Sequence, residues 1–498
     1  MFSQSIEEIK EITKDEEYKR IPVSYELFSD IATPIEVLRI LKNVSNHAYM
    51  LESVEDSQKW GRYTFLGFNP LLEFTCQDGV VKIRGDRQFN ELTDDEITIK
   101  TDNPREIIRD LVLKNKSPKF DYLPPFTGGF VGYFAYDCIK YSEPTLKLDA
   151  ENQDQFKDID LMLFDKVIAF DNFKQKIVLI VNMKCDDLEN NYQKACDELL
   201  AIADLIKNGK KSEIKPLKLK SDFKPVFSRQ KYCEMVEKAK NYIYEGDIFQ
   251  VVLSNRIEAD IEGSLFDTYR VLRTTNPSPY MFYFSSNDIE IAGASPETLV
   301  KLTDNKLYTF PLAGTRPRGK TEHEDMHLEE DLLADEKELA EHNMLVDLGR
   351  NDIGRISEIG SVEVEKYLSI EKFSHVMHIG STVTGTLRSD LDSLAAIDSI
   401  LPAGTLSGAP KIRACEIINE LEDNKRGIYG GAIGYVDLSG NIDTCISIRI
   451  AFARNNKVFI RSGAGIVADS IPENEFDECI NKAKAVMEAL KIADGGIQ

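Results

Sequence analysis

The stretch RGIYGGAIGYVDLSGNIDTCISIRIAFARNNKVFIRSGAGIVAD, residues 426–469, decides the fold. It contains strand-like runs rich in Ile, Val, Tyr and Phe, separated by the turn residues of LSGN and ARNN. Connections this short leave no room for the crossover helix that parallel strands require. The stretch therefore predicts consecutive antiparallel strands.

Further strand-like segments flank this stretch, and they too follow one another with few helices between them. Helical patterns cover about 34–43, 104–114, 229–245, 322–348 and 473–491. We therefore expect an α+β protein with large antiparallel sheets, rather than a doubly wound parallel sheet. The other strand-like segments are GRYTFLGFNPLLEFTC, GVVKIRG, TGGFVGYFAYD, KVIAFDN, KIVLIVNM, IFQVVLSNRIEAD, YMFYFSS, IEIAGAS, TLVKLT and LYTFPLAG.

The composition is that of an ordinary globular protein, with 42% hydrophobic and 29% charged residues in a chain of 498. A formal charge of −23 argues against duplex nucleic acid or an anionic membrane as the main partner. The eight cysteines are scattered without a CxxC pair, which is typical of reduced cytosolic thiols rather than a zinc cluster. The first residues are charged and lack an apolar core, so we expect a cytoplasmic protein.

A lysine-rich stretch with two prolines, residues 206–228, interrupts the pattern of strands and helices. Such a composition shift is typical of a linker. We therefore expect two domains, an N-terminal one over 1–220 and a C-terminal one over 221–498.

The segment YTFPLAGTRPRG, residues 308–319, is a candidate anion site. A strand-like run ends there in a turn around Gly314, with Arg316 and Arg318 just beyond it. Only Ala313 and Thr315 flank the glycine, so the turn contains no Ser, Cys or Lys beside it that could attack a bound molecule. The reacting partner of such an anion must come from elsewhere.

Two glutamates in helical segments are candidates of unequal strength. Glu341 lies in line with Leu345 and Leu348 at helical spacing, where a carboxylate either reaches solvent, pairs with an arginine or binds a hard cation such as Mg²⁺. Spacing alone favours the first two outcomes. Glu478 lies one turn before Lys482, as a solvated ion pair does, and spacing alone does not select it.

Two glycine-containing turns could present backbone N–H groups to an anion. In RSGAGIVADS the candidates are Gly463, Ala464 and Gly465, although the pattern alone favours a plain tight turn. In LPAGTLSGAPKIRACEII, residues 401–418, Thr405 and its neighbours precede a helix that starts near Pro410.

Polar residues within strand-like runs give further candidates. By alternation, Arg449 shares a strand face with Ser447 and Ala451, where it needs an anionic partner from the protein or a ligand. His375 and His378 are an odd interval apart, so they face opposite sides of a strand and cannot form one metal pair.

Ordered motifs in the second half resemble those of the chorismate-utilising enzymes, most of all the members that form anthranilate. The resemblance covers 225–490 densely and extends less densely into the first half through YMLESVEDSQKWGRYTFLGFNP, residues 49–70. The motifs that carry it are SPETLVKL, PLAGTRPRG, AEHNMLVDLGRNDIGR, HVMHIGSTVTG, LPAGTLSGAPKIRA, YGGAIGY, DTCISIR and SGAGIVADSIPENEFDECINKA.

The resemblance implies a two-layered sandwich of large antiparallel sheets around a central cleft, with helices outside. It implies Mg²⁺ held by Glu341 and Glu478, with Glu297 as the acid for the departing C4 hydroxyl and His378 serving the elimination of pyruvate. Chorismate would be held by Gly314, Thr315, Thr405, Tyr429, Arg449, Gly463, Ala464 and Gly465.

The identity of the nucleophile also follows from the resemblance. Ala313 stands where the related aminodeoxychorismate synthases carry a lysine, and Gln250 stands where isochorismate synthases carry a water-activating lysine. The nucleophile is then expected to be ammonia, delivered by a separate glutamine amidotransferase subunit, and the products anthranilate and pyruvate. The alternatives are an aminodeoxychorismate synthase, which Ala313 disfavours, and a non-catalytic regulator that binds chorismate or tryptophan.

Feedback inhibition by tryptophan is a further expectation from the resemblance. The inhibitor would contact Ser53 in MLES and the segment Pro279, Tyr280 and Met281 in NPSPYMF. Prolines in that segment leave backbone carbonyls outside a sheet ladder, where they can accept from an ammonium group. A strand-entry loop that only packs on the N-terminal half gives the same pattern, and sequence alone favours it.

Overall fold

A computed structural model describes residues 2, 4–14, 17–53, 61–85, 96–372 and 376–497. Two large sheets form the framework, and every ladder between their strands is antiparallel, which confirms the predicted fold class. The first sheet has the order β1 (Arg20–Phe28), β10 (Lys176–Lys184), β9 (Lys166–Asp171), β3 (Tyr63–Phe68), β2 (Ala48–Glu52), β14 (Tyr280–Ser285), β15 (Glu290–Ser295), β24 (Ile450–Arg454), β25 (Lys457–Ile466), β13 (Gln250–Glu262) and β11 (Lys218–Leu219), and β12 (Lys224–Pro225) and β21 (Gly408–Ala409) also pair with β13.

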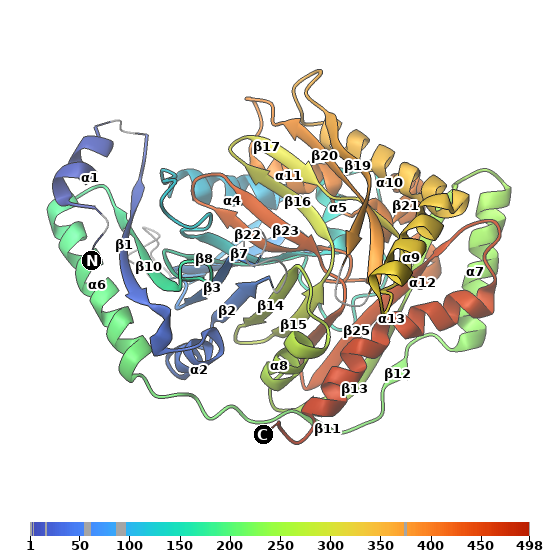
Figure 1. Cartoon of the computed structure of the whole chain (residues 1–498), viewed down its shortest axis with the longest axis horizontal. Coiled ribbons are helices and arrows are strands. Elements are labelled where there is room, and N and C mark those ends of the chain that lie inside the picture. The colour runs from blue at the N-terminus through green and yellow to red at the C-terminus, as the bar shows by residue number, and fades with distance from the viewer. Residues whose placement is uncertain are drawn as a thin grey trace.

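The second sheet lies across the first and is built in the same way from both halves of the chain (Figure 1). Its order is β18 (Leu312–Pro317), β20 (Val376–Thr386), β17 (Lys306–Thr309), β16 (Thr298–Thr303), β23 (Ile442–Ile446), β22 (Ala432–Asp437), β7 (Gly129–Phe134), β8 (Ile159–Phe164), β4 (Leu72–Gln77), β5 (Val80–Gly85) and β6 (Glu96–Lys100), with β19 (Glu363–Lys372) beside β20.

An aromatic core fills the space between the two sheets. Tyr49 and Phe282 enter it from the first sheet, and Tyr133 and Phe164 from the second. Alternation along each strand then leaves a second apolar face on each sheet, which helices must cover. This arrangement is the two-layered sandwich that the family resemblance implies.

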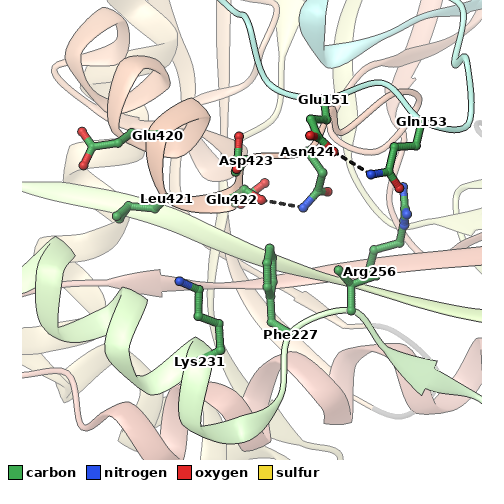
Figure 2. A pocket seen from close by; sticks show the side chains of 11 residues that line it. Glu151, Gln153, Phe227, Lys231, Arg256, Glu420, Leu421, Glu422, Asp423 and Asn424 are labelled. Carbon is green, nitrogen blue, oxygen red and sulfur yellow. Dashed lines mark hydrogen bonds between the residues drawn. The ribbon is translucent and has the colours of Figure 1, made fainter.

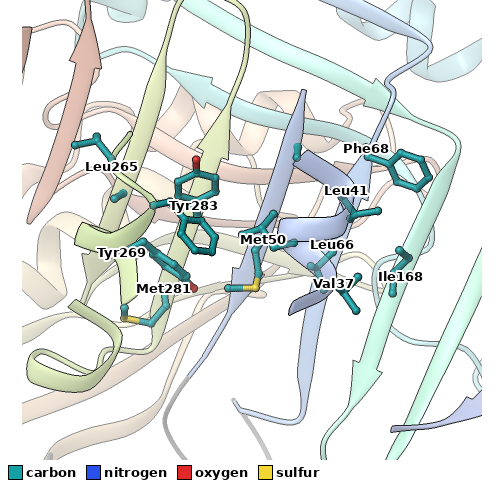
Figure 3. Close-up of a cluster of buried hydrophobic side chains, with 14 of the residues drawn as sticks. Val37, Leu41, Met50, Leu66, Phe68, Ile168, Leu265, Tyr269, Met281 and Tyr283 are labelled. Carbon is teal, nitrogen blue, oxygen red and sulfur yellow. The ribbon is translucent and has the colours of Figure 1, made fainter. Parts of the chain in front are cut away.

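Helices cover the outer faces of both sheets (Figure 1). Figure 3 shows part of the outer core of the first sheet, where Met50 of β2 packs beside Leu41 and where Tyr269 packs beside Met281 and Tyr283 of β14. The helices are α1 (Ile6–Ile12), α2 (Pro34–Val44), α4 (Pro104–Leu113), α5 (Ile139–Ser142), α6 (Leu188–Asn208), α7 (Arg229–Tyr244), α8 (Phe266–Thr275), α9 (Glu322–Ala334), α10 (Glu336–Gly354), α11 (Ser393–Ile400), α12 (Lys411–Glu422) and α13 (Pro472–Ala493).

The single long helix predicted over 322–348 is two helices, which corrects the sequence interpretation. The break lies at Asp335, whose backbone is extended with φ −79° and ψ 101°. Its carboxylate accepts from the backbone N–H groups of Lys337 and Glu338, and so caps the start of α10. An internal aspartate that satisfies two orphan donors makes a new helix start there favourable.

The two predicted domains share both sheets. The first sheet continues from β2 into β14, and the second continues from β7 into β22. Residues 206–228 contribute the short strands β11 and β12, which pair with β13. The division near residue 220 stays a prediction about the chain's organisation.

Facing glycines bring the two halves together in the second sheet. Gly132 of β7 lies opposite Gly434 of β22, with φ +154° and +156°. A Cβ atom at Gly132 would lie 2.1 Å from the backbone oxygen of Asp160, and one at Gly434 would lie 2.1 Å from that of Asp443. Neither of these glycine positions therefore has room for a side chain.

Replacing the seam glycine should destabilise the whole protein. We expect Gly434→Ala to lower the free energy of unfolding by about 2–4 kcal/mol, because backbone atoms cannot move aside as a flexible side chain can. Gly354→Ala at the end of α10 is a control, since its nearest neighbour would be 3.9 Å away. Equal unfolding midpoints for the two variants in urea would contradict this account of the seam.

Candidate active site

Two chain crossings between the sheets lie at the centre of the candidate site. The chain passes from β15 in the first sheet to β16 in the second through Glu297, and from β23 back to β24 through Arg449. The backbone N–H of Ile446 donates to the carbonyl of Glu297 at 2.9 Å, and that of Ala294 donates to the carbonyl of Arg449 at 3.2 Å. The hydroxyl of Ser295 also donates to the Ile446 carbonyl at 2.7 Å. The crossings are thus bonded to each other.

The predicted environment of Arg449 in the middle of a strand is wrong. Arg449 has φ +52°, a left-handed conformation that ends one strand direction and starts another. It therefore does not share a strand face with Ser447 and Ala451. The side chain reaches solvent, yet the protein around it removes enough water to lower the pKa of its guanidinium, while the charge of Glu297 acts in the opposite direction.

The carboxyl group of Glu297 has a pKa close to neutral pH. Burial raises its pKa to about 7, and this effect exceeds the opposing effects of a hydrogen bond from Thr405 and the charge of Arg449. The Thr405 hydroxyl donates to Oε1 at 3.1 Å. A carboxyl with such a pKa is half protonated near pH 7, which suits a general acid.

A small cavity of about 40 Å³ explains the burial of Glu297. Its walls are mostly apolar, so they cannot solvate a carboxylate. The lining residues are Glu297, Thr298, Leu299, Thr309, Phe310, Pro311, Leu345, Leu348, Gly349, Asp352, Ile400, Ala403, Gly404, Thr405 and Ile446.

Thr405 lies in a short 3-10 helix, η3 (Gly404–Leu406), a few residues before α12, which begins near Pro410 as predicted. The following Gly408 and Ala409 form β21, which pairs with Val251 and Gln250 of β13. The hydroxyl of Thr405 therefore bonds the acid Glu297, an interaction that the sequence pattern did not indicate.

His378 of β20 is held as a neutral ring. Its Nδ1 lies 2.7 Å from the carbonyl oxygen of Gly314 and 3.2 Å from the hydroxyl of Thr315. A carbonyl only accepts, so Nδ1 carries the proton and Nε2 keeps its lone pair. Burial lowers the pKa of His378, and the positive charge of Arg449 acts in the same direction. His375 lies outside the described residues.

Gly314 allows a close approach between β18 and α10. Its φ is +66°, and a Cβ atom there would lie 2.9 Å from Leu332 and 3.2 Å from the Glu338 carboxylate. The interpretation of Arg316 and Arg318 as anion receivers is wrong for their resting state, because protein carboxylates already pair with both. Arg316 pairs with Asp331 and Asp335, and Arg318 pairs with Asp325.

The three residues Gly463, Ala464 and Gly465 lie within β25, and they pair with Ser254, Leu253 and Val252 of β13. They form neither an anion nest in a turn nor a plain tight turn, which corrects both interpretations of this segment.

The two glycines leave room for neighbouring polar side chains. A Cβ atom at Gly463 would lie 3.1 Å from the Tyr429 hydroxyl, and one at Gly465 would lie 3.0 Å from the amide nitrogen of Gln250. Ala464 is buried and packs in the cluster on the α7 and α12 side of the sheet. The glycines therefore form a flat floor between Tyr429 and Gln250.

A buried ionic network supports Tyr429 and η3 from behind. Glu422 accepts from Arg426 and from Arg461, each at 2.6 Å, and all three side chains are almost fully buried. Arg426 also donates to the carbonyl of Leu406 at 2.6 Å, and its guanidinium lies 5.7 Å from the centre of the Tyr429 ring. Removing one member would leave buried charge uncompensated, so the network holds these segments in one arrangement.

The proposed metal ligands Glu341 and Glu478 are both exposed, on α10 and α13. Leu345 is buried, as its place in the apolar stripe of this helix predicts. Glu341 lies at the end of that stripe and reaches solvent, which is one of the two outcomes that spacing favoured. Glu478 pairs with Lys482 at 2.7 Å, as its spacing suggested. Lys482 also donates to the Gly463 carbonyl at 3.2 Å, which ties this turn of α13 to the floor.

The chemistry of the nearby acidic groups fits a hard cation. Burial and the charge of Glu341 raise the pKa of Glu338, while burial and the charge of Glu478 contribute to a raised pKa for Glu475. The positive charge of Lys337 on α10 acts to lower the pKa of Glu475 on α13. Glu338 and Glu341 on α10 therefore lie near Glu475 and Glu478 on α13. Over the described residues, no three His, Cys, Asp or Glu side chains converge as a closed metal site. Mg²⁺ commonly uses one or two carboxylates and leaves positions open for substrate.

The residues expected to bind tryptophan come together from both halves. Met281 lies opposite Glu52 in the β2–β14 ladder, and Ser53 follows Glu52 directly. The Tyr280 hydroxyl donates to Asp443 at 2.8 Å. Beside them, the buried Glu52 carboxylate accepts two bonds from Arg273, at 2.6 and 3.0 Å, a pair that spacing did not single out.

A larger cavity of about 310 Å³ contains none of the predicted site residues. It opens between the end of α12, the segment before α7 and a loop of the first half, and Figure 2 shows Phe227 directed toward Glu422 and Asn424. Its lining residues are Glu151, Gln153, Val226, Phe227, Lys231, Arg256, Glu420, Leu421, Glu422, Asp423 and Asn424.

The sequence model of a family described as chorismate binding enzyme matches residues 46–488. Anthranilate synthase component 1 of Acetivibrio thermocellus is 44% identical to the chain, with 99% of each covered, and that of Aquifex aeolicus is 43% identical, with 98% of each covered. The chain belongs to the anthranilate synthase component 1 proteins of the chorismate binding enzyme family.

Solved structures agree with this family assignment. Anthranilate synthase component I from Streptococcus pneumoniae matches with a TM-score of 0.74 and 38% identity, covering 92% of this chain and 98% of that one. The menaquinone-specific isochorismate synthase from Escherichia coli matches with a TM-score of 0.68, 18% identity and coverage of 97% and 98%, which shows a shared fold. Among the helices of the residues described above, none is long and apolar enough to cross a membrane.

The raised pKa of Glu297 should appear in the pH dependence of stability. Its pKa is about 7 in the folded state against an ordinary value of 4.5, so the free energy of unfolding falls as pH rises from about 4.5 to 7. Relative to wild type, the variant Glu297→Gln should gain about 1–3 kcal/mol in the free energy of unfolding between pH 5 and pH 8. Urea unfolding at both pH values measures this difference. Parallel pH profiles for the two proteins would contradict the assigned pKa.

Proposed function

We propose that this chain is the synthase subunit that converts chorismate and ammonia to anthranilate and pyruvate. The observation that carries the proposal is the placement of Glu297, with its raised pKa, and Arg449 at the two hydrogen-bonded crossings of a chain in this family. At these crossings, Glu297 can deliver a proton and Arg449 can hold a carboxylate. Chorismate has a leaving hydroxyl and two carboxylates, so it requires both functions.

The first chemical step needs an acid. Ammonia attacks C2 of the ring, the double bond shifts, and the C4 hydroxyl departs as water with the proton of Glu297. Arg449 and the hydroxyl of Tyr429 hold the enolpyruvyl carboxylate, and the floor of Gly463 and Gly465 accommodates the ring. Glu297 is left as a carboxylate beside Arg449, which stabilises the charge that forms.

The second step is an elimination. Loss of the proton from C2 and cleavage of the bond to the enolpyruvyl oxygen release pyruvate and make the ring aromatic. His378 supplies a neutral imidazole for this proton transfer, because Gly314 holds its Nδ1–H and leaves Nε2 basic.

A hard cation completes the proposed site. Glu341 and Glu478 would hold Mg²⁺, which when bound neutralises the ring carboxylate of chorismate. The nearness of Glu338 and Glu475 supports this role, since burial first and the neighbouring carboxylate second raise the pKa of each of these two groups.

The nucleophile is proposed to be external ammonia from a separate glutaminase subunit. Ala313 is small and nearly buried, and Gln250 provides an amide rather than an amine beside the floor. Lys482 approaches the same floor, but Glu478 and the Gly463 carbonyl bind its ammonium group.

Anthranilate formation is tested directly with the purified chain, chorismate, Mg²⁺ and an ammonium salt. The fluorescence of anthranilate should rise with time and should require all three additions. An aminodeoxychorismate product in its place would support the alternative enzyme, and no product at all would support a binding protein without catalysis.

The metal proposal predicts a selective loss of activity. Glu341→Gln and Glu478→Gln remove one negative charge each and keep the side-chain shape, so ammonium-driven activity should fall about 100-fold or more while the unfolding midpoint stays unchanged. Glu488→Gln is the matched control, because Glu488 is exposed on the same helix as Glu478. Full Mg²⁺-dependent activity in Glu341→Gln would rule out this ligand.

Tryptophan inhibition is proposed at the seam of β2 and β14. Ser53 and Met281 belong to different halves yet adjoin one ladder, so a bound amino acid could couple the two halves to the site. We expect Ser53→Phe to weaken tryptophan inhibition about tenfold or more, with chorismate turnover nearly unchanged, because the bulky ring fills the ligand's space. Inhibition curves against tryptophan measure the effect, and identical curves for variant and wild type would place the inhibitor elsewhere.

A further inference from the structure

The cavity of about 310 Å³ in Figure 2 lies outside the candidate active site and has no role in the proposed reaction. Its volume is at the lower end of the range of about 300–1,000 Å³ that is typical of small-molecule sites. Its lining side chains are charged or polar except for Val226, Phe227 and Leu421. Apolar surface among a few charged groups is what a small ligand of mixed character requires.

One wall of the cavity is the C-terminal end of α12, which ends at Glu422. The last carbonyl groups of a helix lack intrahelical partners and carry partial negative charge, and the last turn of α12 contains no basic residue to offset it. Asp423 follows with φ +46° and adds a carboxylate that forms no ion pair or hydrogen bond with any described residue. This wall therefore favours a cationic group.

The facing wall has the opposite polarity, because it is the start of α7 at Arg229 and the segment before it. The first turn of α7 contains no acidic residue, so the positive end of its dipole is not offset. Lys231 lies in this turn and extends toward the end of α12 in Figure 2. Over the described ranges, its ammonium group has no ion-pair partner. This wall therefore favours an anionic group.

Arg256 of β13 provides a second positive group at the cavity. Its guanidinium pairs with Asp154 at 3.0 Å, and it lies 5.4 Å from the centre of the Phe459 ring. The Nε of Arg256 is buried and has no hydrogen-bond partner in the part of the chain that the structure describes. A buried donor without an acceptor is unfavourable, and a carboxylate bound in the cavity would supply the acceptor.

Phe227 provides an aromatic surface between the charged groups. In Figure 2 its ring points toward Glu422 and lies between Lys231 and Arg256. Its backbone is fixed, because its N–H donates to the Asn255 side chain at 3.0 Å and its carbonyl accepts from the same side chain at 2.8 Å. A ring on a fixed backbone is a prepared surface for an apolar group, since little entropy is lost on binding.

We propose that this cavity binds a free amino acid with an apolar side chain. The ammonium group of the ligand lies near Asp423 and the end of α12, and its carboxylate lies near Lys231 and Arg256. Its side chain covers the ring of Phe227. A ligand with one kind of charge would satisfy only one wall. The cavity shares no residue with the β2–β14 seam proposed for tryptophan, and the inference does not depend on the proposed reaction.

Calorimetric titration with L-phenylalanine tests the proposal. The protein used carries Ser53→Phe, so that an amino acid cannot occupy the seam proposed for tryptophan. Phenethylamine lacks the carboxylate of L-phenylalanine, and 3-phenylpropionate lacks its ammonium group. We expect the dissociation constants of both analogues to be about tenfold or more higher than that of L-phenylalanine, because each leaves one wall without its counter-charge.

Two further substitutions in the same protein locate the site. Asp423→Asn and Lys231→Gln should each raise the dissociation constant for L-phenylalanine about tenfold or more, with unchanged unfolding midpoints in urea. Asparagine adopts the left-handed backbone readily, so Asp423→Asn preserves the end of α12. Lys238→Gln is the matched control, because Lys238 is exposed on α7 outside the cavity, and its dissociation constant should stay within about twofold of the parent value.

Three results would overturn the proposal. The first is the absence of binding heat up to about 10 mM L-phenylalanine. The second is equal affinity for phenethylamine and L-phenylalanine, which would indicate a site for cations alone. The third is unchanged affinity in both Asp423→Asn and Lys231→Gln, which would place any bound amino acid elsewhere on the protein.

Discussion

The candidate site depends on the hydrogen bonds that join two crossings of the chain between its sheets. The Ser295 hydroxyl and the Ile446 carbonyl, and the backbone bonds of Glu297 and Arg449, fasten one crossing to the other. Each crossing interrupts a ladder, so backbone groups that a sheet would pair must find partners there. Because these backbone groups bond to each other, the two crossings hold the Glu297 carboxyl and the Arg449 guanidinium in one geometry.

Two buried glutamates, one in the candidate site and one behind it, have pKa values shifted in opposite directions. Glu297 faces apolar walls with a single hydrogen bond, so its pKa rises and its proton becomes available. Glu422 is still more deeply buried, yet two arginines and Ser254 hold its pKa below the usual range. A glutamate therefore serves as a proton donor at position 297 and as an anion at position 422, where it holds the arginine that packs on Tyr429.

Sequence predicted the sheets well, because alternating apolar residues and short turns are local signals. It missed where strands change sheets, since the run from Asp443 to Arg454 reads as one strand although Arg449 turns left-handed within it. The helix break at Asp335 had a readable signal in its capping aspartate. Glu297, His378 and Glu478 were reached only through resemblance, because burial, tautomer and the nearness of α10 to α13 arise from contacts between distant segments.

The sharing of both sheets between the halves has a consequence for synthesis on the ribosome. When the first half emerges, β2 and β7 have open edges, because their partners β14 and β22 are translated much later. Unpaired edges invite pairing with other chains, so the nascent first half needs protection until the second follows. The two halves would also be poor candidates for separate expression, since each would expose the seam that the other normally fills.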